Sequence, residues 1–301
     1  MQLPAAVREW IEEQASRLSL AELRQAAADL SADYREGRAP HLAGPERALA
    51  YLVARMPATY AAAYAVLREN ACRIGPIGSI LGAGAATLAA RAHFPDAALT
   101  LVERDPAFSS AARQWLPDAT PIAADIARLK GLPPHDLVIA AYSLGEFGAQ
   151  AAQSLWQAAR VALALIEPGT PRGFSLILKV RGALLAAGAH MIAPCPAPMA
   201  CPMAAPDWCH FAARVERSSL HRRVKGGELG YEDEKFSYVA LARHSVDLPA
   251  ARIVRHPQHR PGLIEIQSCT PQGLRTERVA KHARERFRAA RHAAWGDAGI
   301  S

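Results

Sequence analysis

The N-terminal part of the chain alternates apolar and polar positions with the spacing of helices. Apolar residues recur every three or four positions over residues 4–18, as they do along one face of a helix. Ser19-Leu-Ala-Glu22 is a capping-box sequence, which predicts the start of a second helix. A third helical pattern covers residues 45–70, and Pro57 is expected to kink or split it because proline interrupts helical hydrogen bonding. We therefore predict a helical N-terminal module over residues 1–72.

Short apolar runs replace this pattern from residue 73 onward. Five of them have the length and the flanking turn residues of strands, at residues 79–81, 98–102, 121–123, 136–141 and 174–180. Helical patterns lie between them, at residues 86–93, 109–115 and 149–166. Strands that alternate with helices are typical of a parallel, doubly wound sheet. Residues 73–188 are therefore predicted to form an α/β core of the Rossmann type.

The alternation breaks at residues 189–235, a segment with several prolines and three cysteines. Late strands are predicted at residues 236–243 and 263–267. A basic amphipathic helix is predicted over residues 277–294. Residues 236–301 are thus expected to complete the sheet and to end in a basic helix.

Composition places the chain among ordinary globular proteins. Half of its 301 residues are apolar and 21% are charged. It contains no run of eighteen apolar residues, so no membrane span and no membrane partner are predicted. The N-terminus lacks the charged and then apolar layout of a signal peptide. We expect a cytoplasmic monomer.

The charge of the chain is concentrated in its C-terminal third. The formal net charge is +7, and residues 211–301 carry 17 Lys and Arg against 10 Asp and Glu. The preceding 210 residues carry 18 of each sign. Such a basic segment favours a polyanionic partner, RNA first among them, and a solvated basic surface is the alternative. The candidate RNA contacts lie just after Cys209, the third cysteine of residues 189–235. They are Arg214, Arg217, Arg222, Arg223 and Lys225.

A glycine turn follows the first predicted strand. Gly82 and Gly84 lie between that strand and a helix, where small residues let the backbone approach a ligand at the helix N-terminus. Glu103 ends the second strand, where a carboxylate can bind both hydroxyls of a ribose, and Asp125 follows the third. The glycine turn, Glu103 and Asp125, in this order along the chain, favour S-adenosylmethionine over NAD as the cofactor. They therefore favour a class I methyltransferase-like sheet.

The turn departs from the usual methyltransferase motif at two positions. Ile80 stands where an acidic residue is usual, and Ala86 stands where a third glycine is usual. A pseudo-enzyme that keeps the fold and binds the cofactor weakly or not at all therefore stays open. Ser143 and Glu146 lie after the fourth strand at the expected mouth of the site, but this segment lacks the motifs for N-methylation or for attack at pyrimidine C5. Both are catalytic candidates, and no catalytic base is assigned.

Five cysteines in a chain expected to be cytoplasmic are not predicted to form disulfides. Cys72 stands alone and is predicted to be a small core residue. Cys195, Cys201 and Cys209 lie in the proline-rich loop, and Cys269 ends a late strand. Grouped thiolates repel one another and oxidise unless a cation holds them, so a shared metal is predicted, with unconnected thiols as the alternative. Four sulfurs suit tetrahedral zinc or a [4Fe–4S] cluster, and spacings wider than those of CxxC knuckles favour the cluster.

Several of these segments resemble one protein family, the methyltransferase-like assembly factors of the small ribosomal subunit. That family is known from the mitochondrial ribosome and has bacterial members. Its similarity to this chain extends over most of the sequence, including Ala141-Tyr-Ser-Leu-Gly-Glu146. The strings that carry it are Cys195-Pro, Cys201-Pro-Met, Asp207-Trp-Cys-His-Phe211, Tyr231-Glu-Asp-Glu-Lys-Phe-Ser-Tyr238 and Ala293-Ala-Trp-Gly-Asp297.

The resemblance implies a [4Fe–4S] cluster on Cys195, Cys201, Cys209 and Cys269, and binding to small-subunit rRNA or a ribosome precursor. It leaves methyl transfer open. The leading hypothesis is a cluster-containing, rRNA-binding assembly protein on a class I S-adenosylmethionine methyltransferase-like scaffold. The alternatives are an active S-adenosylmethionine-dependent rRNA methyltransferase and a zinc-binding, RNA-binding pseudo-methyltransferase.

Overall fold

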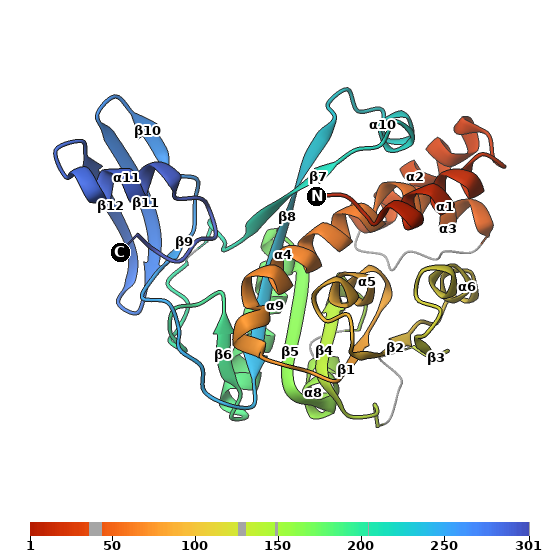
Figure 1. The fold of residues 1–301 in the computed structure, drawn as a ribbon, viewed down its shortest axis with the longest axis horizontal. Coiled ribbons are helices and arrows are strands. Elements are labelled where there is room, and N and C mark those ends of the chain that lie inside the picture. The colour runs from red at the N-terminus through yellow and green to blue at the C-terminus, as the bar shows by residue number, and fades with distance from the viewer. Residues whose placement is uncertain (36–43, 126–130, 148–149, 204, 301) are drawn as a thin grey trace.

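The computed structural model describes residues 1–35, 44–125, 131–147, 150–203 and 205–300. Figure 1 shows N-terminal helices above a long sheet, with a smaller lobe standing beside it. The N-terminal helices are α1 (Ala5–Ala15), α2 (Leu20–Arg35), α3 (Pro45–Ala54) and α4 (Met56–Ile74). Within the described residues, no helix combines the length and apolarity that crossing a bilayer requires.

The N-terminal helices begin and end where local sequence signals indicate. The Glu22 amide donates to Ser19 Oγ at 3.2 Å and the Ser19 amide donates to Glu22 Oε2 at 2.8 Å, which confirms the capping box. Pro57 lies in the first turn of α4, where its missing N–H costs nothing, and α3 ends just before it. The predicted helix over residues 45–70 is therefore split, as expected from Pro57.

In the described part of the chain, eight strands form the main sheet, in the order β3-β2-β1-β4-β5-β8-β6, with β7 pairing to β8. Strands β1 to β5 pair in parallel, and β8 is antiparallel to β5 and to β6. This mostly parallel sheet with an inserted antiparallel strand is the predicted class I methyltransferase-like Rossmann fold. The strands are β1 (Ser79–Gly82), β2 (Ala98–Val102), β3 (Thr120–Ile122), β4 (His135–Ala141), β5 (Ala159–Pro168), β6 (His190–Ala193), β7 (Phe211–Glu216) and β8 (Tyr231–Ala242).

Helices cover both faces of this sheet. Residues 137–140 of β4 and 163–166 of β5 are at most 1% exposed, so these central strands are buried on both sides. Ile139 and Ala164 face the layer that contains α4 and α5, whereas Val138 faces the layer of α8 and α9. The core helices are α5 (Gly84–His93), α6 (Pro106–Trp115), α7 (Leu144–Phe147), α8 (Ala151–Ala158) and α9 (Pro171–Ala186).

Two predictions in the core are wrong. Residues 174–180, predicted as a strand, lie in α9, which Thr170 caps by accepting a hydrogen bond from the Gly173 amide at 3.1 Å. Pro171 follows at the start of this helix, a signal that the apolar run obscured. The second half of the predicted helix 149–166 is strand β5, whose uninterrupted apolar sequence fits a strand buried on both faces.

The C-terminal part also differs from the prediction. After α10 (Ser219–Lys225) and β8, a second sheet forms from β9 (Arg252–Ile253), β10 (Gln258–Arg260), β11 (Leu263–Thr270) and β12 (Gly273–Ala280), followed by α11 (Arg284–His292). Of the described strands from β8 onward, only β8 belongs to the main sheet. The first residues of the predicted helix 277–294 form the end of β12. We call residues 252–300 the C-terminal lobe. Its own buried core consists of Ile253, Ile264, Ile266, Val279 and Ala290.

Candidate metal centre and glycine turn

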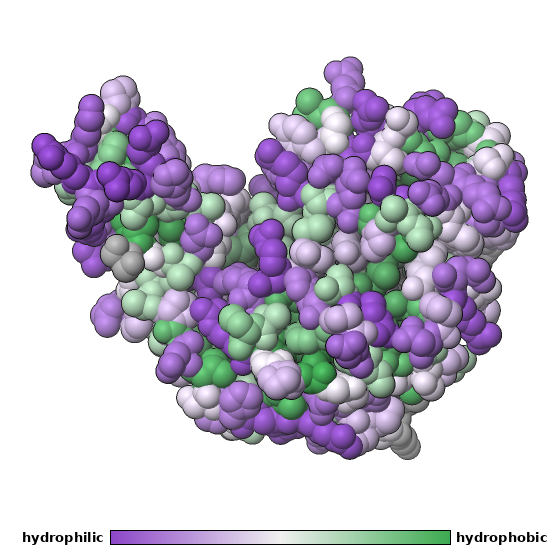
Figure 2. All heavy atoms as spheres, in the orientation of Figure 1, coloured by the Kyte–Doolittle hydropathy of each residue, from purple (hydrophilic) through white to green (hydrophobic). Residues whose placement is uncertain are grey.

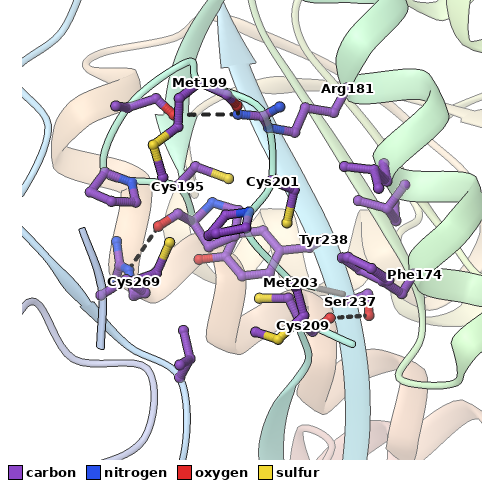
Figure 3. Close-up of a pocket in the computed structure, with 18 of the residues that line it drawn as sticks. Phe174, Arg181, Cys195, Met199, Cys201, Met203, Cys209, Ser237, Tyr238 and Cys269 are labelled. Atoms are coloured by element: carbon purple, nitrogen blue, oxygen red, sulfur yellow. Dashed lines mark hydrogen bonds between the residues drawn. The ribbon is translucent and has the colours of Figure 1, made fainter. Parts of the chain in front are cut away.

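Four cysteines from two distant segments line one pocket. Cys195, Cys201 and Cys209 lie on the loop between β6 and β7, which we call the cysteine loop, and Cys269 lies on β11 of the C-terminal lobe. The pocket has about 630 Å³ of space, part of it continuous with solvent. Figure 3 shows the four labelled cysteines arranged around this space, near the ring of Tyr238. The structure therefore brings together all four cysteines that the sequence singled out.

The cysteine loop is held to the core by bonds to its backbone. Arg181 Nη2 donates to Met199 O at 2.7 Å, and Arg252 Nε donates to Pro194 O at 3.0 Å. Ser237 Oγ of β8 donates to Cys209 O at 2.8 Å. The loop follows no regular ladder, so these side chains satisfy carbonyls that would otherwise be buried without a donor. Helix α9 and strands β8 and β9 thereby hold the backbone of the loop that carries three of the four thiols.

The pocket disfavours free thiolates. Burial raises the pKa of Cys209 far above its usual range, and the neighbouring thiols raise it further. Burial, with Cys195 and Cys201 nearby, raises the pKa of Cys269 to about 11. Burial also raises the pKa of Cys195, although Arg181 acts against it. A metal would reverse this balance, because a coordinated thiol loses its proton to the cation.

The donor set, four thiols, has the chemistry of a site for a thiophilic metal. Among the described residues, no three Cys, His, Asp or Glu side chains lie close enough to hold one ion. A tetrahedral zinc with Zn–S bonds of about 2.3 Å needs its sulfurs within about 4 Å of one another. The four sulfurs thus supply the ligand chemistry of either tetrahedral zinc or an iron–sulfur cluster.

An aromatic group joins the cysteine loop to the C-terminal lobe. Trp208 stacks on His210 with 5.1 Å between ring centroids, and His210 meets the edge of Trp295 at 4.8 Å. His256 also makes an edge contact with Trp295, with 4.8 Å between ring centroids. These rings therefore belong to the contact between the cysteine loop and the C-terminal lobe, and none of them is part of the pocket wall.

The glycine turn lies where the sequence predicts it, at the end of β1. A Cβ on Gly82 would lie 2.5 Å from Thr87 Oγ1 and 3.1 Å from Ile139 Cγ2, so a larger residue does not fit. Gly84 has a φ of 53°, a conformation that favours glycine. Both glycines are needed for the turn itself, whether or not a cofactor binds.

A Gly82→Ala variant is expected to be less stable than the wild type by about 1–3 kcal/mol, the usual cost of overpacking a buried site. Urea denaturation followed by circular dichroism measures this difference. Gly182→Ala is the matched control, because an added Cβ there meets nothing within 4 Å on helix α9. This control is expected to gain about 0.5–1 kcal/mol, since alanine favours the helix. Equal stability of Gly82→Ala and the wild type would contradict the tight turn.

Two carboxylates lie near the turn at the carboxyl ends of neighbouring strands. Glu103 Oε1 accepts a hydrogen bond from the Asp105 amide at 2.9 Å, and burial raises the pKa of Glu103. Asp125 lies 3.7 Å from Arg104, between Oδ2 and Nη1. Asp136, which the sequence reasoning missed, accepts from the amides of residues 78 and 79 and so anchors the start of β1. Ile80 is fully buried in that strand.

The segment after β4 is tied to the protein by internal bonds. Tyr142 has a φ of 58°, and its hydroxyl donates to Glu234 Oε1 at 2.6 Å. Glu167 accepts from the Leu144 amide at 2.8 Å. Ser143 is buried, and its Oγ has no hydrogen-bond partner among the described residues. Glu146 belongs to α7, but its side chain lies outside the described residues. This geometry identifies no catalytic base.

Three of the five predicted RNA contacts form ion pairs inside the protein. Arg214 donates to both Asp233 oxygens, at 2.8 and 3.0 Å. Arg217 and Lys225 donate to Glu232 Oε2 at 2.5 and 2.6 Å. Burial alone would raise the pKa of Glu232. Hydrogen bonds from His221 of α10 and from these two cations instead hold the pKa of Glu232 well below its usual range. The remaining two, Arg222 and Arg223, lie on α10, and neither forms an ion pair with a described residue.

Solved structures with related folds are distant. An N-methyltransferase, NodS of Bradyrhizobium japonicum, with S-adenosyl-l-homocysteine, is 12% identical, with a TM-score of 0.40 over 60% of this chain and 84% of that one. The magnesium protoporphyrin IX methyltransferase of Synechocystis is 13% identical, with a TM-score of 0.39 over 70% of this chain and 89% of that one. Likenesses this low do not indicate what this chain binds.

Sequence comparisons are more specific. The human "Ribosome assembly protein METTL17, mitochondrial" is 30% identical over 181 residues, which are 54% of this chain and 39% of that protein. The fission yeast (Schizosaccharomyces pombe) "Rsm22-cox11 tandem protein 2, mitochondrial" is 26% identical over 89% of this chain and 45% of its own length. This chain thus spans less than half of these relatives. The family model "Mitochondrial small ribosomal subunit Rsm22" matches residues 45–299, so the chain belongs to the Rsm22 family of methyltransferase-like proteins of the small ribosomal subunit.

Proposed function

We propose that this chain is an assembly factor of the small ribosomal subunit that binds rRNA and holds a [4Fe–4S] cluster on its four pocket cysteines. One observation carries the proposal: Cys195, Cys201 and Cys209 of the loop and Cys269 of the C-terminal lobe line the same pocket. The family supports the assembly role, because the human relative is named as a ribosome assembly protein. Sequence spacings wider than those of CxxC knuckles favour a cluster over zinc.

The cluster has a structural role in this proposal. The C-terminal lobe has a core of five buried residues, which is small for 49 residues and calls for an additional link. Protein contacts supply part of that link: Arg252 pairs with Glu69 of α4, Arg255 pairs with Asp207, and Trp295 packs on His210. Thiolate bonds from both the loop and β11 to one cluster would add a covalent connection.

Unpaired charge on the C-terminal lobe supports RNA binding there. The lobe carries ten Lys and Arg against four Asp and Glu. Figure 2 shows its surface to be strongly hydrophilic and separated by a notch from the region of α10 and the N-terminal helices. Six of its exposed cations form no ion pair with a described residue: Arg260, Arg275, Lys281, Arg284, Arg288 and Arg291. These cations are free to contact phosphates, whereas Arg214, Arg217 and Lys225 are partly neutralised by carboxylates of β8.

Removing unpaired cations of the lobe is expected to weaken RNA binding most. For Arg288→Gln with Arg291→Gln, the slope of log affinity against log salt should fall in magnitude by about 1.4–1.8, from two lost phosphate contacts at about 0.7–0.9 each. Filter binding of transcribed small-subunit rRNA fragments at several salt concentrations measures it. Arg278→Gln with Arg286→Gln is the control, since both are paired with lobe carboxylates and the net charge changes equally. An equal decrease of the salt slope in both double variants would contradict phosphate contacts by Arg288 and Arg291.

S-adenosylmethionine-dependent methyl transfer is the second candidate function. It is favoured by the turn at Gly82 and Gly84, with Glu103 at the carboxyl end of the adjacent strand. If the glycine turn and Glu103 form a working site, calorimetry should detect S-adenosylmethionine binding to the wild type, and Glu103→Ala should weaken it. Absence of binding at millimolar cofactor would reject methyl transfer and leave the assembly role intact.

A further inference from the structure

Two buried arginines line the cysteine pocket. Arg181 comes from α9 and is 6% exposed, and Arg252 comes from β9 and is 2% exposed. Both belong to the pocket wall together with the four cysteines. Arginine is rarely buried to this degree unless an anion accompanies it, because a guanidinium loses its hydration on burial.

Each arginine uses some of its N–H groups on the protein and keeps another without a partner. Arg181 Nη2 donates to Met199 O at 2.7 Å and, at 3.3 Å, to the carbonyl of residue 197. Arg252 Nε donates to Pro194 O at 3.0 Å, and its Nη1 donates to Gly296 O at 2.6 Å and to Glu69. Arg181 Nε and Arg252 Nη2 are buried and have no hydrogen-bond partner among the described residues.

These unmatched donors point to an anion that belongs in the pocket. A buried donor without a partner costs about 1–3 kcal/mol, and more when it is charged. Arg252 has the carboxylate of Glu69 beside it, but Arg181 forms no ion pair with any described residue. Metal-bound cysteines supply this negative charge, because a coordinated thiol gives up its proton to the cation. Four thiolates around a cluster core of charge 2+ leave a net charge of about −2.

We propose that Arg181 and Arg252 are positioning residues of the metal centre: they balance the negative charge of the metal-bound thiolates and clamp the backbone of the loop that carries them. This inference rests on the proposed function, because it requires metal-bound thiolates. Arg252 also joins α4, the cysteine loop and the last residues of the lobe through Glu69, Pro194 and Gly296.

The proposed charge balance predicts the direction in which the reduction potential of the cluster changes. Reduction of the cluster adds negative charge, so nearby cations favour the reduced form and raise the reduction potential. Arg181→Met removes one cation, and its midpoint potential is expected to be more negative than that of the wild type. Arg181→Lys keeps the charge and is expected to keep the potential, while it loses part of the loop clamp.

The test uses the whole chain, reconstituted anaerobically with ferrous iron and sulfide. Iron content, midpoint potential and the rate of cluster loss to a chelator are compared for the wild type, Arg181→Met, Arg181→Lys and Arg252→Met. Loss of a residue that supports metal ligands typically weakens metal binding about 10- to 100-fold, and each Met variant is expected to release its cluster faster by that order. Arg243→Met is the control, since Arg243 also donates to two backbone carbonyls but does not line the pocket.

The outcomes separate the two claims. A wild type that binds no metal defeats the proposed function itself. A wild type that holds its cluster, with Met variants of unchanged potential and unchanged rate of cluster loss, overturns only the role of the arginines. Circular dichroism reports folding. If Arg252→Met does not fold, the comparison of Arg181→Met with Arg181→Lys still decides, because the two differ mainly in charge.

Discussion

Replacement of Cys209 by serine is expected to remove both the brown colour of the protein and its retention of RNA. Serine offers no thiolate, so the cluster would lose one of its four ligands and its link to the end of the cysteine loop. Without the cluster the loop and the C-terminal lobe lose a shared anchor, and we expect RNA affinity to fall about tenfold or more, which corresponds to about 1.4 kcal/mol or more. Visible absorption after anaerobic purification and filter binding with small-subunit rRNA fragments measure the two effects.

Cys72→Ser is the matched control for this variant. Cys72 is an exposed free cysteine at the end of α4 and does not line the pocket, contrary to its prediction as a core residue. The same chemical change there is expected to leave colour and RNA affinity unchanged. A Cys209→Ser protein that is colourless but binds RNA with full affinity would break the proposed coupling between the cluster and the RNA-binding surface.

Removal of the cluster is expected to loosen the C-terminal lobe while the main sheet stays folded. The lobe relies on a five-residue core and on links to the rest of the protein, whereas β4 and β5 are buried on both faces. Hydrogen exchange of the cluster-free protein should therefore show β11 and β12 exchanging at least about tenfold faster than in the loaded protein, a change of about 1.4 kcal/mol in local stability.

The central strands provide an internal reference in the same experiment. Amides of β4 and β5 should exchange at the same rate with and without the cluster, because no pocket residue lies on either strand. Faster exchange throughout the chain would indicate global unfolding. Unchanged exchange in β11 and β12 would contradict a linking role for the cluster.

The sequence contained most of what determines the fold. The capping box at Ser19, the break at Pro57 and the alternation of strands and helices predicted the N-terminal module and the parallel sheet correctly. The errors came from apolar runs without a clear period. In α9 the decisive signal was the Thr170 cap followed by Pro171. In β5 the alanines favour a helix by their intrinsic propensity, and only the burial of the strand on both faces explains why this segment is a strand.

The site was only partly visible in the sequence. Cys195, Cys201 and Cys209 are close in the chain, so their grouping was predictable. Cys269 was predicted to join them from far along the chain, and in the structure it lines the same pocket from β11 of the lobe. Nothing local marks the two pocket arginines, because only tertiary packing brings α9 and β9 to the loop. The pairing of Arg214 with Asp233 was in principle accessible, since these residues face each other across the β7–β8 ladder. Finding it required the register of two strands that were not both predicted.

The iron and sulfide content of the anaerobically purified wild type, with its visible spectrum, tests the central claim most directly. A [4Fe–4S] cluster on the four pocket cysteines predicts about four irons and about four sulfides per chain, with a broad absorption shoulder near roughly 400 nm. The Cys209→Ser protein, purified in parallel, should lack all three signals. One zinc per colourless chain, or full iron content in the Cys209→Ser protein, would contradict the account.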